Sequence, residues 1–106
     1  MSFFIKQNDT VPSIRVTLKN GSGTAIDLVN ATVRFHMRTL TGTTKVKSSA
    51  AVVNANTGIV QYNWGGTDTN TIGSYQGEFQ VTYPDATIET FPNDGFVHIE
   101  ILDDIA

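Results

Sequence analysis

Apolar and polar residues alternate in several short stretches of this chain. A period of two is the pattern of a strand that buries one face and exposes the other. The clearest stretch runs from Tyr75 to Tyr83, and similar alternation marks residues 14–18, 31–37, 59–64 and 97–101. The pattern therefore predicts at least five half-buried strands.

Weaker signals predict further short strands at residues 3–5, 45–47, 50–53 and 87–91. Clusters of Asn, Gly, Pro and Asp separate the strands, as turns require. Residues 65–71 are expected to cross over, with a helical turn capped by Thr67 or Asp68, and Pro84-Asp85-Ala86 is expected to be a hairpin turn.

No helical period exceeds a single turn. The whole pattern predicts one all-β domain over residues 1–106, an immunoglobulin-like antiparallel β-sandwich of seven to nine strands.

Three aromatic residues are assigned structural roles. The segment around Tyr75 resembles the entry to the sixth strand of immunoglobulin-like domains, where a tyrosine hydroxyl bonds back to the preceding turn. Phe79 is expected in the core, and Trp64 is expected to close one end of it. The alternative is a sugar-binding platform made by Trp64, Tyr62 and Tyr83. Packing is favoured over the platform because these rings belong to alternating apolar rows.

Composition excludes several function classes. The net charge is −3 and the seven basic residues are scattered, so nucleic acid is not an expected partner. The absence of cysteine excludes disulfides, thiolate metal sites and a cysteine nucleophile. No segment approaches the length of a membrane span and no signal peptide is recognised, so assembly in the cytoplasm is expected.

No motif for catalysis, a cofactor or a metal is found. The chain has no nucleophile elbow and no phosphate-binding glycine loop. His36 and His98 fall at outward positions without a fixed acidic partner, so a metal site is not expected. A hydrolase using two carboxylates is the remaining catalytic hypothesis, but nothing places two of them across a cleft. The chain is therefore not expected to be an enzyme.

Five sequence segments lie at residues 9–18, 26–37, 57–64, 73–81 and 89–95. Taken together, they resemble the immunoglobulin-like N-terminal domain of phage baseplate upper proteins and related small phage structural proteins. The resemblance implies a non-enzymatic virion subunit of a baseplate, tail, neck or capsid decoration. In that family the domain usually heads a longer chain, whereas this sequence stops at Ala106. A free-standing subunit is therefore an equally consistent expectation.

The two apolar ends of the chain are the candidate interface. It comprises Phe3, Phe4 and Ile5 at the start and Leu102 and Ile105 at the end. Other virion proteins, or further copies of the chain in a homo-oligomer, are the expected partners that would cover them. The alternative is that both ends pack on their own domain.

Overall fold

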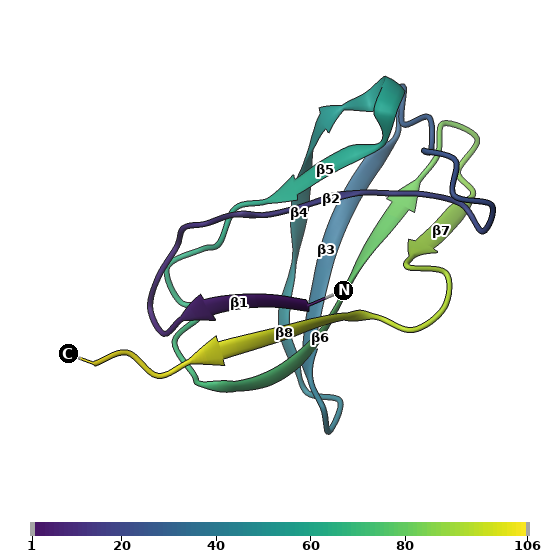
Figure 1. Cartoon of the computed structure of the whole chain (residues 1–106). Helices are drawn as coiled ribbons and strands as arrows, with labels where there is room; N and C mark the ends of the chain where they lie inside the picture. The colour runs from purple at the N-terminus through teal and green to yellow at the C-terminus, as the bar shows by residue number, and fades with distance from the viewer. Residues whose placement is uncertain (1, 106) are drawn as a thin grey trace.

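The computed structural model describes residues 2–105 and confirms an all-β, immunoglobulin-like sandwich (Figure 1). Its strands are β1 (Ser2–Lys6), β2 (Ile14–Thr17), β3 (Thr32–Thr39), β4 (Thr44–Asn54), β5 (Ile59–Tyr62), β6 (Gly73–Thr82), β7 (Ile88–Phe91) and β8 (Val97–Leu102). A single 3-10 turn, Ala55–Thr57, precedes β5. Residues 65–71 were expected to hold a helical turn, but they form non-helical turns in which the N–H of Asp68 donates to the carbonyl of Gly65 at 3.2 Å.

The strands pair in the order β1-β8-β6-β3-β4-β5-β2, and β7 lies beside β6. Every pair is antiparallel except β1 with β8, which run parallel from Ser2 opposite His98 to Lys6 opposite Leu102. The expectation of a wholly antiparallel sandwich is wrong at this one edge. A period of two indicates a strand but does not give its direction relative to a neighbour, which explains the error.

Strand β4 belongs to both layers of the sandwich. Its first part pairs with β3 and its last part, from Ala51 to Asn54, pairs with β5. The sequence predicted two separate strands here, at residues 45–47 and 50–53. That prediction is wrong, because the alternation continues through Ser48 and Ser49 and Val46 points into the core.

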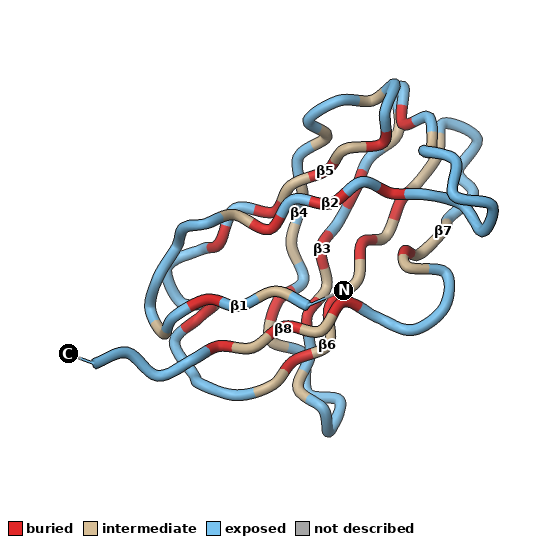
Figure 2. The backbone as a smooth tube through the Cα atoms, in the orientation of Figure 1, coloured by how far each residue is buried: buried red, intermediate tan, exposed pale blue. Residues whose placement is uncertain are grey.

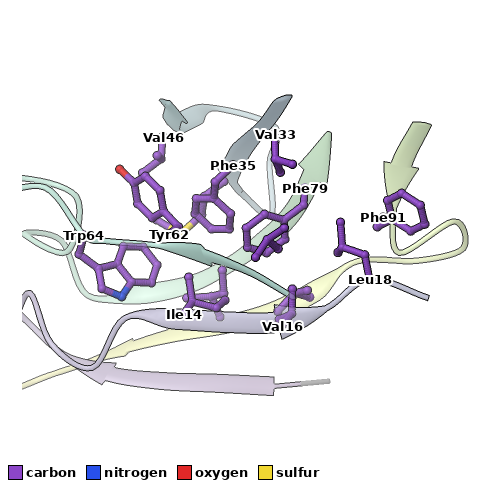
Figure 3. Packing of buried hydrophobic residues seen from close by; sticks show 14 of the residues in the cluster. Ile14, Val16, Leu18, Val33, Phe35, Val46, Tyr62, Trp64, Phe79 and Phe91 are labelled. Carbon is purple, nitrogen blue, oxygen red and sulfur yellow. The ribbon is translucent and has the colours of Figure 1, made fainter. Parts of the chain in front are cut away.

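The core is built from the inward rows of the strands, which appear as the buried segments of the tube in Figure 2. Phe35 on β3 lies opposite Phe79 on β6, with ring centroids 5.0 Å apart, and neither ring is exposed. Tyr62 stacks on Phe35 at 4.7 Å, and Trp64 meets it edge-on at 5.7 Å (Figure 3). Aromatic contacts of this kind supply a large share of the buried area in so small a domain.

The hairpin between β6 and β7 turns as predicted. Tyr83 donates its backbone N–H to the carbonyl of Thr87 at 2.9 Å, and Ala86 adopts a positive φ of 71°. The hydroxyl of Tyr83 also donates to Glu89 at 2.7 Å, which joins the two strands beyond the turn.

The β1–β2 connection is held against residues 64–69. The buried hydroxyl of Thr69 donates to the carbonyl of Asp9 at 2.7 Å, and the indole N–H of Trp64 donates to the carbonyl of Pro12 at 3.1 Å. Tyr62 donates to Asp68 at 2.5 Å, and the same carboxylate accepts the N–H of Gly65. This end of the sandwich is therefore fixed by buried or half-buried polar groups that all have partners.

Candidate interaction surface

The three residues predicted to be structural all lie in the core. Trp64, Tyr75 and Phe79 are buried, as Figure 3 shows for Trp64 and Phe79. The hydroxyl of Tyr75 donates to the carbonyl of Thr71 at 2.8 Å, four residues upstream. This is the corner contact that the sequence predicted, and it fixes the entry of the chain into β6.

The proposed sugar platform does not form. Tyr62, like Trp64, is buried, and Tyr83 is half-buried with its ring packed against the core. A sugar needs an accessible ring face, so the observation that motivated a carbohydrate-binding module is removed.

The candidate interface residues separate into two groups. Phe4 is 58% exposed, and Leu102 and Ile105 are exposed as well. Ile5 is only 4% exposed, because its position in β1 turns it into the core of its own domain. Phe3 is half-buried against Trp64, with ring centroids 5.8 Å apart.

Only part of each end is thus available to a partner. Ile5 is withdrawn from the candidate interface, and Phe3 serves mainly to cover Trp64. The exposed part is Phe4 and Leu102 on the outer face of the β1–β8 edge, together with Ile105 beyond it.

Ser74, Glu100 and His98 form a surface cluster with the residue types of a catalytic triad. The carboxylate of Glu100 accepts the hydroxyl of Ser74 and also contacts Nε2 of His98 at 2.8 Å. The imidazole would have to lie between the hydroxyl and the carboxylate to act as a base. Here the carboxylate lies between them, so the serine is not activated.

The two histidines do not meet. His36 on β3 lies opposite Glu78 of β6, and His98 on β8 lies opposite Gln76 of β6, so one strand separates them. Within residues 2–105 no group of three or more potential metal ligands comes together.

The described residues line two hollows that bear on function. The first, of about 270 Å³, lies on the outer face of β3, β4 and β6 and is lined by His36, Arg38, Lys47, Gln76, Glu78 and Phe96, among others. The second, of about 310 Å³, lies between β2 and residues 91–97, and its apolar walls combine core side chains with the exposed Phe96. Each is lined by a single carboxylate, Glu78 in the first and Asp94 in the second. Neither hollow offers the carboxylate pair that a glycosidase mechanism requires.

Sequence reasoning did not identify the first hollow. The only signal of this hollow in the sequence was the set of basic residues on the outer face of the strand of residues 31–37. Phe96 completes the hollow from the β7–β8 connection, and nothing in the local sequence relates it to His36, sixty positions earlier.

Among the helices formed by the described residues, none is long and apolar enough to cross a membrane.

These features define the class of protein: an immunoglobulin-like β-sandwich whose exposed apolar side chains include a group at one sheet edge. Residues 4–98 match the family described as BppU N-terminal domain, and the chain belongs to that family of phage baseplate upper protein domains. The family indicates a structural protein of the phage particle. This confirms the resemblance seen in the sequence.

The fold is shared more widely. The crystal structure of CopC from Methylosinus trichosporium OB3b superposes with a TM-score of 0.58, at 13% sequence identity, over 97% of this chain and 85% of that one. At so low an identity the likeness shows the fold alone. No curated protein sequence matches the chain.

Proposed function

We propose that this chain is a non-enzymatic subunit of a phage baseplate that acts through protein–protein contacts. The observation that carries the proposal is the family match over residues 4–98. The buried rings and the order of Ser74, Glu100 and His98 support it, since they leave neither a sugar platform nor an activated nucleophile.

The outer face of the β1–β8 edge is the proposed contact surface. Strand β1 pairs with β8 on one side and stands at the end of the strand order, so its other edge can accept a further strand. Phe4, Leu102 and Ile105 are exposed there, and a partner that covered them would remove apolar surface from water. The partner is another virion protein or a second copy of the chain, joined during assembly in the host cytoplasm.

Protein composition of purified particles tests the proposal. Mass spectrometry should detect the chain in particles of the phage that encodes it, and its complete absence from them would overturn the proposal.

A matched pair of variants tests the contact surface. In a phage lacking the coding region, Phe4→Ser supplied in trans should enter particles poorly. Val53→Ser removes an apolar side chain that is exposed on β4, and it should enter like the parent. Equal incorporation of the two variants would rule out the β1–β8 edge as the contact.

A further inference from the structure

The hollow on β3, β4 and β6 is a second surface, separated from the β1–β8 edge. In the strand order β6 lies beside β8, and β3 and β4 follow it. The neighbours of His36 on the adjacent strands are Lys47 and Glu78, so these three side chains cross the floor of the hollow. Arg38 and Gln76 line one end, and Phe96 forms a wall.

His36 has an unmade hydrogen bond in this hollow. Its Nε2 atom is buried and has no hydrogen-bond partner among the described residues. Buried polar atoms are nearly always paired, and an exception calls for an explanation. A bound group that reached Nε2 would supply the missing partner.

The pKa of His36 is lowered by burial, and Arg34 and Lys47 lower it further, while Glu78 opposes them. The imidazole is therefore neutral at pH 7, and its N–H and its lone pair lie on different ring nitrogens.

Cations outnumber anions around His36. Lys47 and Arg38 line the hollow, Arg34 acts on His36 from the same strand, and Glu78 is the one carboxylate in the lining. Arg38 donates its Nε to Gln76 at 2.9 Å, which orients the guanidinium. No salt bridge joins Arg34, Arg38 or Lys47 to a carboxylate within residues 2–105. Two cations and one carboxylate line the hollow, so its lining carries one net positive charge.

Phe96 adds an apolar component to the same surface. Its ring is 42% exposed although it borders the charged lining. An exposed ring beside unpaired cations matches a ligand that carries a carboxylate next to an apolar group.

We propose that this hollow binds an acidic residue flanked by apolar side chains, presented by a segment of another virion protein. The carboxylate would lie between Arg38 and Lys47 and bond to His36, and its apolar neighbour would cover Phe96. The inference rests on the proposed function, because it names the chemistry of one partner contact. A nucleic acid is a poorer match, since its phosphates require an extended basic stripe and Glu78 interrupts this one.

Titration of the isotopically labelled protein with two short peptides tests the chemistry. Acetyl-Leu-Glu-Leu-amide should shift the NMR signals of the His36 ring and of the Lys47 and Phe96 amides. Acetyl-Leu-Gln-Leu-amide, which differs only in the charge, should bind at least about fivefold more weakly. Equal shifts with both peptides, or equal shifts with inorganic phosphate, would overturn the proposal.

Charge variants test the contact in the particle. Arg38→Gln with Lys47→Gln should lower incorporation at least about fivefold, whereas Arg15→Gln with Lys19→Gln, which removes two positive charges on the β2 side, should not. If the first pair proves unstable in a thermal melt, Lys47→Gln alone replaces it, since the Lys47 side chain makes no salt bridge within residues 2–105.

The outcomes separate the two proposals. If the parent and both double variants enter particles equally, the hollow has no role and the proposed function stands. If the parent itself is absent from particles, the proposed function fails, and this inference fails with it.

Discussion

A methyl group added at Gly77 would lie 2.6 Å from Cδ1 of Ile99 and 3.3 Å from the ring of Phe35. Gly77 lies on β6, and its Cα faces the core between β3 and β8. The side-chain-free position lets Ile99 and Phe35 fill the space that a larger residue would occupy. Gly77→Ala is expected to destabilise the domain by about 1–3 kcal/mol, measured by urea unfolding, because it overpacks the core.

Two controls isolate this contact. Gly66→Ala adds a methyl where no atom lies within 4 Å, and it should change the free energy of unfolding by less than about 0.5 kcal/mol. Ile99→Val removes the Cδ1 atom, so the double variant should be more stable than the sum of the two single changes indicates. Strict additivity would contradict the proposed clash.

Tyr75→Phe should cost about 1 kcal/mol of stability. The change removes the hydroxyl that donates to the carbonyl of Thr71 and keeps the ring in the core. Thr71→Ala keeps that backbone carbonyl and serves as the control, with a smaller expected loss. If both variants unfolded at the same urea concentration, the hydrogen bond from Tyr75 to the carbonyl of Thr71 would not contribute to stability.

The raised pKa values of Tyr62 and Tyr83 lead us to expect that the domain loses stability at high pH. Burial and the Asp68 carboxylate raise the pKa of Tyr62 to about 12. In the unfolded chain this hydroxyl ionises near its ordinary value of 10.0, so between pH 10 and 12 the unfolded state releases its proton first. The free energy of unfolding should therefore fall as pH rises through this window, by at most about 1.4 kcal/mol per pH unit from Tyr62.

Urea unfolding at several pH values between 9 and 11.5 measures the slope. Tyr62→Phe should flatten it. Tyr83→Phe should flatten it as well, because burial and Glu89 raise the pKa of Tyr83 to about 12. An unchanged slope in Tyr62→Phe would show that its hydroxyl titrates normally in the folded protein.

Glu100 should titrate at unusually low pH. The hydroxyl of Ser74, and then His98, lower its pKa below the ordinary 4.5. The contribution of Glu100 to stability is thus present above pH 4.5 and is lost as pH falls through the lowered pKa. In Ser74→Ala the pKa, followed by NMR of the Glu100 side-chain carbonyl, should rise toward 4.5. Ser49→Ala, an exposed change on β4, should leave it in place.

Local alternation was sufficient to predict most strands and the sandwich class, and the likeness of the Tyr75 segment to immunoglobulin-like domains predicted its corner contact. Alternation failed where a strand changes partners. The sequence predicted two short strands at residues 45–47 and 50–53, yet Ser48 and Ser49 pair with Phe35 and Arg34 of β3, so β4 continues from one layer into the other.

Contacts between distant segments left no local signal. The parallel pairing of β1 with β8 joins residues at the two ends of the chain, and the hollow around His36 needs Phe96 from another part of it. The burial of Ile5 follows from that pairing, which is why a list of apolar end residues could not separate Ile5 from Phe4.

The parallel pairing of β1 and β8 also determines how the domain carries load. In Figure 1 the chain enters at the start of β1 and leaves beyond the end of β8, at opposite ends of the same pair. A force applied between these two points runs along both strands, so it loads the hydrogen bonds of the pair together in shear instead of opening them one at a time. Tension between the two ends is therefore resisted first by the β1–β8 ladder, before the rest of the sandwich is strained.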